Sequence, residues 1–481
     1  MRSFARLPSI LLAATALAGC TVGPTYHPPE AGLTSRFLAA DAILPTGNTD
    51  WWQGFNDPIL VSLITKAVAG NTDLAQARAR IDQSRAEARS VNAALLPTLD
   101  GTGGVSTNSQ SLETPVGKVT QILGLPRGYN AYSVGAQASW EIDLFGGLRR
   151  AREAARADLD ASQASAGAVA IAISAETADS YLTLRALQAR LKVATDLEES
   201  EHLLVDLVHQ RFDQGVSAER ELNRTRAALD GIRAQMSPLR AGIQAQLNRL
   251  DVLVGEQPGS NHALLSDARP IPVAPMPSGS AAPADLLRRR PDVIAAEHRL
   301  AAANARIGIA VADYYPHVSL SGLLGAASLG ASSLFTGGAV QASGGAGVRW
   351  RLFDFGRVDA EVAGAHGRQA EALAAWRGSV LVAAEDVETA LIRLAEAHVE
   401  RAALTQQVAS LTTARNQSRQ AYRGGVVSLI EVTDADRELL TASDRLETVK
   451  ADEARAAVAA YRALGGGWQP EVAATIASAN H

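Results

Sequence analysis

Residues 132–144 read YSVGAQASWEIDL, and this stretch decides the fold class because apolar and polar residues alternate through it without exception. The apolar positions are Tyr132, Val134, Ala136, Ala138, Trp140, Ile142 and Leu144. A period of two residues is typical of a β-strand with two unlike faces. The stretch therefore predicts a strand of about the ten residues that a membrane barrel strand needs.

The same pattern returns in the second half of the chain, because the chain contains an internal repeat. Residues 71–97 align without a gap with residues 290–316, at an offset of 290 − 71 = 219. From Trp140 and Trp350 onward the offset is 350 − 140 = 210. Because 210 is even, both tryptophans fall on the apolar face of their strands. Each half is expected to hold a helix, a hairpin, a very long helix and a return helix.

Four strands are expected, at about 98–107, 131–144, 317–327 and 341–353. Beyond the N-terminus no run of 18 apolar residues could form a membrane helix, so a membrane crossing would require a closed β-barrel. Four strands cannot close a barrel, since known single-chain barrels need at least about eight. An oligomer is therefore expected, with dimer and trimer both open. A soluble β-sandwich is the alternative interpretation of the alternation.

Aromatic residues stand at the ends of the predicted strands. A membrane barrel carries aromatic girdles where it meets the lipid headgroups. The residues expected in such a girdle are Trp140, Trp350, Tyr314 and Tyr315.

Two very long helices are expected, from about 148 to 212 and from about 358 to 422, followed by return helices at about 218–254 and 428–464. A helix of roughly 65 residues would be about 100 Å long. A coiled-coil rod is the default interpretation, but strands at one end favour the wall of a tunnel. The first long helix is expected to bury one stripe, formed by Val169, Ile173, Tyr181, Leu184, Leu191, Leu204 and Val208.

Residues 1–19 have the form of a secretory signal, with Arg2 and Arg6 before a short apolar core. The segment ends in Leu-Ala-Gly-Cys at Cys20, which resembles a bacterial lipobox. Cys20 is the only cysteine, so its lipidation would leave no thiol for a disulfide or a nucleophile. A buried free cysteine is the alternative. By resemblance, Thr21 after the cysteine favours sorting to the outer membrane.

Composition and motifs exclude several classes of protein. The net charge of −5 argues against nucleic acid as a partner. The sequence contains no GxxxxGK[ST], no HExxH and no nucleophile elbow, and the nine histidines have no metal-like spacing. We therefore expect no enzyme, no metal site and no cofactor apart from the covalent lipid. A periplasmic adaptor is a further rival, but it should lack paired strands and a repeat in halves.

Four motifs carry a resemblance to a known family. They are GPTY at 23–26, WWQGFNDP at 51–58, ADLLRRRPD at 284–292 and ANARIG at 303–308. The chain resembles TolC-like outer membrane efflux proteins, in particular the NodT/OprM-type lipoproteins of resistance-nodulation-division (RND) systems. The resemblance implies a mainly α protein with a membrane β-barrel. A homotrimer would form a 12-stranded barrel continued by a periplasmic α-helical tunnel with an equatorial domain.

The resemblance also implies a function and partners. The chain would be the outer-membrane channel of a tripartite efflux pump, a passive exit duct for small toxic molecules or drugs. Its partners would be a periplasmic adaptor (membrane fusion protein), an inner-membrane RND-type pump and outer-membrane lipid, with no nucleic acid. The duct of a type I-like secretion system and a structural periplasmic lipoprotein remain alternatives.

The repeat sets the expected domain boundaries. After the signal at 1–19 come a lipidated N-terminal and equatorial segment at 20–55, the first repeat at 56–255, a proline-rich equatorial linker at 256–283, the second repeat at 284–465 and a tail at 466–481.

The turns at 212–217 and 422–427 are expected to form the tips of helical hairpins. Glycine suits such turns because a tight turn often needs positive φ. By resemblance the tips constrict the duct and contact the adaptor through Gly215, Val216, Gly424, Gly425 and Val426.

A gate is expected near the second tip. By motif position in the family, Ile430 and Asp434 would form rings at the aperture, with Arg437 close enough to pair. A ring of aspartates attracts cations and repels itself, so it can select and gate. The alternative is that Asp434 and Arg437 are ordinary i,i+3 surface neighbours. The first repeat has Arg224 at the equivalent position, 434 − 210 = 224, so its tip is expected to play a different part.

Overall fold

A computed structural model describes residues 21–30, 32, 50–275 and 289–468. The expected signal, Cys20, residues 284–288 of the ADLLRRRPD motif and parts of the linker and tail lie outside the described residues. The chain divides into two compact units. The sheet unit contains Asp82–Asp160 and Glu297–Ala374 together with the described residues up to Pro28. The helical unit contains the other described residues.

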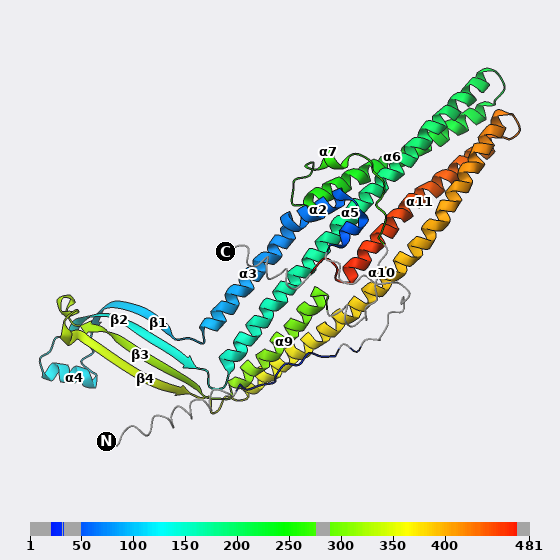
Figure 1. Ribbon diagram of the computed structural model, residues 1–481. Coiled ribbons are helices and arrows are strands. Elements are labelled where there is room, and N and C mark those ends of the chain that lie inside the picture. The colour runs from blue at the N-terminus through cyan, green and yellow to red at the C-terminus, as the bar shows by residue number, and fades with distance from the viewer. Residues whose placement is uncertain (1–20, 31, 33–49, 276–288, 469–481) are drawn as a thin grey trace. The chain divides into compact units, whose positions relative to one another are not determined.

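The sheet unit is built on one four-stranded antiparallel sheet (Figure 1). Its strands follow the order β1 (Thr98–Ser109), β2 (Gly128–Ile142), β3 (His317–Ser328) and β4 (Val340–Arg349). Each repeat contributes one hairpin, and the two hairpins pair through β2 and β3. All four expected strands are present.

The strand ends differ by a few residues from the expected ones. β4 ends at Arg349, where 353 was expected, because Arg349 pairs with His317, the first residue of β3. Pro316 precedes His317 and has no N–H with which to extend the ladder. β2 begins at Gly128 rather than 131 because it pairs with β1 as far as Ser109.

Along each strand apolar residues recur at alternate positions, and the register brings these residues of both hairpins onto one face of the sheet. Ala136 lies opposite Leu324, which lies opposite Ala342 on the next strand. Directly opposed residues point to the same side of a sheet, so these rows form a continuous apolar face. This face is open in the single chain, where Leu99 is 74% and Val348 is 70% exposed.

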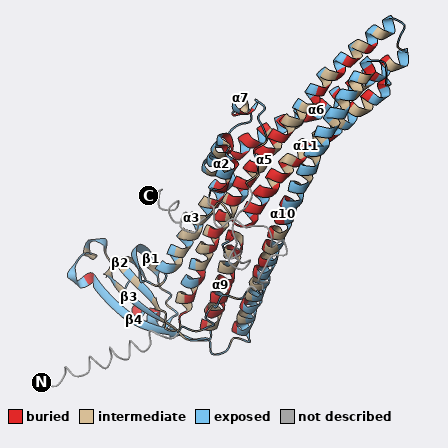
Figure 2. Ribbon diagram, turned by 45° about the vertical axis from the view of Figure 1, so that its right-hand side comes forward, coloured by how far each residue is buried: buried red, intermediate tan, exposed pale blue. Residues whose placement is uncertain are grey.

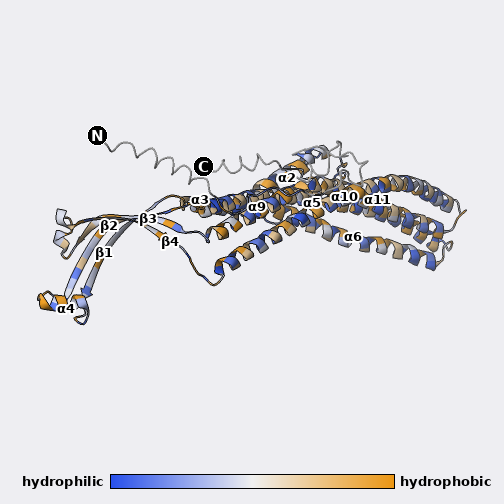
Figure 3. Cartoon of the chain, turned by 90° about the horizontal axis from the view of Figure 1, so that it is seen from below, coloured by the Kyte–Doolittle hydropathy of each residue, from blue (hydrophilic) through white to orange (hydrophobic). Residues whose placement is uncertain are grey.

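The loop between β1 and β2 contains a short helix that the sequence pattern did not predict, α4 (Pro115–Ile122). Pro115 occupies the first turn, and the Thr114 hydroxyl accepts a hydrogen bond from the Gly117 N–H at 3.2 Å. The helix shows apolar residues in Figure 3, and Ile122 is 83% exposed.

Two pairs of long helices follow the hairpins, at the bounds that the sequence predicted to within one or two residues. α5 (Gly147–Asp213) and α10 (Arg357–Arg423) each contain 67 residues, and α6 (Glu219–Leu253) and α11 (Leu429–Ala463) each contain 35. Shorter elements precede the strands or join the repeats, namely η1 (Trp51–Phe55), α2 (Pro58–Gly70), α3 (Thr72–Ala93), α7 (His262–Leu265) and α9 (Pro291–Ala312). Within the described ranges, every helix is too short or too polar to cross a membrane.

Buried residues concentrate on the helices, whereas the strands are largely exposed (Figure 2). The main core of the helical unit joins α2, α5, α6 and α11. Trp51 stacks on Tyr461 at 5.5 Å between ring centroids. Asp57 caps α2 and accepts a hydrogen bond from the Tyr181 hydroxyl at 2.6 Å. Residues of the WWQGFNDP motif therefore anchor this core.

The predicted stripe of α5 is confirmed as a packing face. Five of its residues are buried, and the other two, Val169 and Leu191, are partly buried against the same core. The buried five are Ile173, Tyr181, Leu184, Leu204 and Val208.

The two repeats hold their return helices by equivalent contacts. The Asn71 side chain donates to the Leu253 carbonyl at 2.9 Å, and Arg290 donates to the Ala463 carbonyl at 3.0 Å. These positions correspond in the repeat, since 290 − 71 = 219 and 463 − 253 = 210. Arg290 is buried and also pairs with Asp386 at 3.1 Å. The arginine of the RPD motif therefore ties α9 to both α10 and α11.

Candidate gate at the helical hairpin tips

The two hairpin tips have the same backbone geometry. Gly215 and Gly425 both have a φ of 73°. The Val216 N–H donates to the Arg211 carbonyl at 2.8 Å, and the Val426 N–H donates to the Ala421 carbonyl at 2.9 Å. This closure satisfies carbonyls that a helix end leaves unpaired. The positive φ of Gly215 and Gly425 explains why both turns need glycine.

The tips expose apolar side chains. Val216 is 68% exposed and Val426 is 80% exposed. Gly424 precedes the turn glycine of the second tip, where the first repeat has Gln214. The geometry leaves these residues accessible, and their contact with an adaptor stays a prediction.

A small core joins the α5–α6 hairpin to the α10–α11 hairpin just behind the tips. Its buried members are Leu204, Val208, Leu222, Tyr422, Leu429 and Val432. The Arg211 guanidinium also lies 4.7 Å from the centre of the Tyr422 ring, a cation–π contact. The two hairpins of one chain are thus packed together.

The expected gate residues lie on the exposed surface of α11. Ile430 is 50% exposed, and the Asp434 side chain is about half exposed. Asp434 lies between two arginines, at 4.0 Å from Arg437 and at 3.7 Å from Arg224. Exposed pairs of this kind contribute roughly 0–1 kcal/mol, so the pairs can open easily. The sequence had marked Arg224 only as a departure from the repeat, whereas the structure makes it a partner of Asp434.

A buried charge cluster that no sequence pattern had indicated lies farther along the same helices. Asp436 is 3% exposed and accepts hydrogen bonds from Arg415 at 2.9 Å and from Arg419 at 2.8 Å. Both arginines also donate to the Ser200 hydroxyl, at 2.9 and 2.5 Å. The cluster therefore connects α5, α10 and α11. Glu201 is buried beside it, at 2% exposure.

Glu201 is the unusual member of this cluster. Its Oε1 atom is buried without a hydrogen-bond partner among the described residues. Burial raises the pKa of Glu201 to about 7, helped by the negative charge of Asp436 and opposed by Arg419 and Arg415. The carboxyl group therefore titrates near neutral pH.

One sequence feature could have indicated part of this cluster. Arg415 and Arg419 stand four residues apart and share a helix face. Their partners come from other helices, so only the packing of α5 and α11 against α10 could reveal a site there. The repeat gives no help, because the first repeat has Val205 and His209 at the positions of the arginines.

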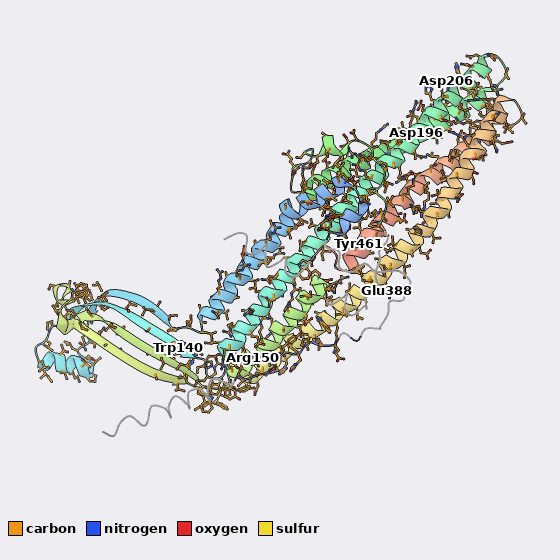
Figure 4. All side chains as sticks on the ribbon, in the orientation of Figure 1. Trp140, Arg150, Asp196, Asp206, Glu388 and Tyr461 are labelled. Carbon is orange, nitrogen blue, oxygen red and sulfur yellow. The ribbon has the colours of Figure 1, made fainter. Side chains whose placement is uncertain are left out.

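The expected girdle residues lie where the strands meet the helices. The Trp140 indole N–H donates to the Leu95 carbonyl and the Trp350 indole N–H to the Tyr314 carbonyl, both at 3.0 Å. Leu95 and Tyr314 correspond in the repeat, since 314 − 95 = 219. Both indoles remain partly exposed, at 37% for Trp140 and 55% for Trp350. Figure 4 labels Trp140 at its corner. Each tryptophan thus keeps its apolar ring outward while its N–H is satisfied.

The other two motifs meet in the sheet unit. The Arg150 side chain donates to the carbonyls of Val22 and Gly23, both at 3.1 Å. The Asn304 amide donates to the Pro24 carbonyl at 3.1 Å. A Cβ on Gly23 would lie 2.4 Å from the Cα of Gly308, so this approach requires glycine. The segment that follows Cys20 is therefore fixed at residues 22–24, whereas Cys20 itself lies outside the described residues.

The family model "Outer membrane efflux protein" matches residues 63–256 and 282–466, one match for each repeat. Pyoverdine export outer membrane protein OpmQ of Pseudomonas putida is 32% identical over 447 residues, covering 92% of this chain and 93% of the relative. Nodulation protein T of Rhizobium leguminosarum bv. trifolii is 28% identical over 459 residues, covering 94% and 96%. The structure of the outer-membrane channel OprN matches with a TM-score of 0.86 and 32% identity, covering 93% of this chain and 100% of that one.

Proposed function

The chain belongs to the outer membrane efflux protein family, and we propose that it is the exit duct of a tripartite efflux pump for small toxic molecules or drugs. It is an outer-membrane efflux component, as its relatives are. A passive exit duct needs no catalytic group.

The observation that carries the proposal is the open apolar face of the sheet. Leu324 and Val340 are 64% and 62% exposed on that face, alongside the residues already described. A contiguous apolar face exposed on a protein surface marks contact with lipid or a partner. β1 and β4 are edge strands, and edge strands seek a pairing partner. A homotrimer would join them into a closed barrel of 3 × 4 = 12 strands in the outer membrane.

The partners of the proposed duct are a periplasmic adaptor and an inner-membrane RND-type pump. The exposed valines of the tips, Val216 and Val426, offer apolar contact points for the adaptor. Cys20 would carry the covalent lipid that anchors the chain. The segment beginning at Val22 is fixed by backbone and side-chain hydrogen bonds, which gives such an anchor a rigid attachment point.

The gate of the proposed duct consists of Ile430 and Asp434, repeated in each protomer. Apolar side chains around a narrow axis resist wetting, and a ring of carboxylates attracts cations. Asp434 pairs with Arg224 at 3.7 Å and with Arg437 at 4.0 Å, and such exposed pairs contribute little free energy. Modest movement of α11 would therefore open the ring.

Single-channel conductance in planar bilayers tests this function. The wild-type protein is expected to show small, cation-selective currents. The double variant Ile430→Ala/Asp434→Ala should conduct several times more and lose cation selectivity. The control Ile392→Ala/Asp230→Ala removes an equally exposed isoleucine and an exposed aspartate elsewhere, and should behave as wild type. Absence of current in every variant would favour a structural lipoprotein over a duct.

A further inference from the structure

A basic pocket of about 500 Å³ lies in the sheet unit, where α5 begins after the corner that follows β2. Four arginines and one glutamate supply the charge of its wall: Arg149, Arg150, Arg152, Arg156 and Glu153. Figure 4 labels Arg150 at this corner. The formal charge of the wall is 4 − 1 = +3.

Two of the arginines are already engaged by other groups. Arg149 pairs with Asp143 at 3.1 Å, and Arg150 pairs with Glu153 at 2.8 Å. Arg152 and Arg156 are exposed, and neither has a carboxylate within ion-pair distance among the described residues. Because they stand four residues apart, they share a face of α5. The pocket therefore keeps about two positive charges available for an anion.

The repeat shows that this charge is not required by the fold. The second long helix begins with the same corner, but it has Asp359, Ala360, Val362 and His366 at the four equivalent positions. A purely structural need for arginine at the start of the long helix would apply to both repeats. The second corner has two arginines of its own, Arg351 and Arg357, and both pair with Glu361, at 3.9 and 3.0 Å. The four positions that line the pocket carry arginine only at the corner that also holds the N-terminal segment.

The position of the pocket next to this segment points to lipid. Thr21 lines the pocket and immediately follows Cys20 in the chain. A lipidated cysteine must place its acyl chains in the bilayer, which puts the neighbouring surface at headgroup level. Strand β2, which the proposed function places in the membrane, ends at Ile142, seven residues before Arg149.

We propose that this pocket binds the phosphate headgroup of an anionic phospholipid in the leaflet that holds the lipid anchor. This inference rests on the proposed outer-membrane function and on lipidation of Cys20. Guanidinium groups match phosphate oxygens with paired, charge-assisted hydrogen bonds, and basic pockets at membrane interfaces recognise anionic lipids. Arg152 and Arg156 supply those bonds, while Arg150 holds the N-terminal segment beside them.

The test measures lipid affinity with the full-length, lipidated oligomer. The protein is delipidated in detergent and titrated with phosphatidylglycerol or with phosphatidylcholine, and bound lipid is counted by native mass spectrometry. Wild type is expected to prefer phosphatidylglycerol. Each basic residue near an anionic surface contributes about fivefold in affinity, so Arg152→Gln/Arg156→Gln should bind it about 30-fold more weakly. The control Arg368→Gln/Arg377→Gln removes two exposed arginines from α10 and should bind like wild type.

Four further measurements decide between the possible outcomes. Cys20→Ala should retain the headgroup preference, because the pocket and not the covalent lipid provides it. Inorganic phosphate at equal concentration should compete poorly, and equal competition would mean that the pocket holds soluble anions instead. If Arg152→Gln/Arg156→Gln loses oligomer stability but keeps its lipid affinity, the arginines contact a neighbouring protomer and the proposal is wrong. Normal conductance of all variants would leave the duct function intact even if lipid binding fails.

Discussion

Replacement of Glu201 by glutamine is expected to abolish a pH-dependent loosening of the helical hairpins. Glu201 is buried, and its pKa lies at about 7 instead of the ordinary 4.5. Local opening of the hairpins would hydrate the carboxyl group and return its pKa to the ordinary value. The closed state therefore binds a proton that the open state releases, so the closed state is most favoured below pH 4.5 and loses stability as the pH rises to about 7. Above pH 7 the stability of the closed state no longer changes through this group.

The size of the effect follows from the pKa difference. A difference of 7 − 4.5 = 2.5 between the two pKa values corresponds to about 3 kcal/mol, or on the order of a few hundredfold in the opening equilibrium. The groups that face Glu201 are Asp436 from α11 and Arg415 and Arg419 from α10. Glu201 is the member of this cluster whose pKa is raised into this range, so the expected pH dependence is assigned to Glu201.

Hydrogen exchange measures this equilibrium directly. Exchange of amides in α5 and α11 near the cluster, corrected for the intrinsic effect of pH, should accelerate in wild type between pH 5 and 7.5. The Glu201→Gln variant should exchange slowly and without a pH-dependent step. The control Glu199→Gln changes an exposed neighbour on the same helix and should keep the wild-type profile. A flat wild-type profile, or a step that survives in Glu201→Gln, would refute the reasoning.

Five further substitutions probe the stability of the fold, measured by unfolding of the purified protein in guanidinium chloride. Arg290→Ala breaks a buried arginine's pairs and is expected to cost about 3 kcal/mol, so an effect below 1 kcal/mol would contradict the clamp between the helices. Trp140→Phe and Trp350→Phe each remove one indole hydrogen bond, and each should cost about 1 kcal/mol. Clearly different costs would show that the two corners are not equivalent. Gly231→Ala places a methyl group in open space on α6 and should stabilise the fold by about 0.5–1 kcal/mol. Gly146 has a φ of 84°, and a Cβ at this position would lie 2.7 Å from Thr21, so Gly146→Ala should destabilise the fold. The same sign for both substitutions would be evidence against the described corner.

Local patterns explain why the elements could be predicted from the sequence. The alternation around Trp140 indicated a strand because side chains on a strand alternate in direction whatever the strand pairs with. The absence of proline from 148 to 212, ended by a glycine turn, indicated a helix that continues without a break. Glycine at 215 and 425 marked the tips because few other residues accept positive φ. These features depend on neighbours in the chain.

The candidate gate was only partly predictable. Ile430, Asp434 and Arg437 were placed by resemblance, and the structure adds Arg224 as a partner of Asp434. The helix α4 was missed because its apolar residues lie in a loop without a long periodic pattern. The aromatic girdle positions were predicted, but their hydrogen bonds to backbone carbonyls were not.

The sequence by itself determined the repeat, the four strands, the long helices and their turns, because hydrogen bonding within helices and the direction of strand side chains are set over a few residues. Only the tertiary structure decided which hairpins pair, and which charges become buried. Ser200 and Arg415 are 215 positions apart in the chain, yet they are hydrogen-bonded at 2.9 Å. Burial and the charges around it set the pKa of Glu201, and those depend on how three helices pack. No local pattern encodes that environment.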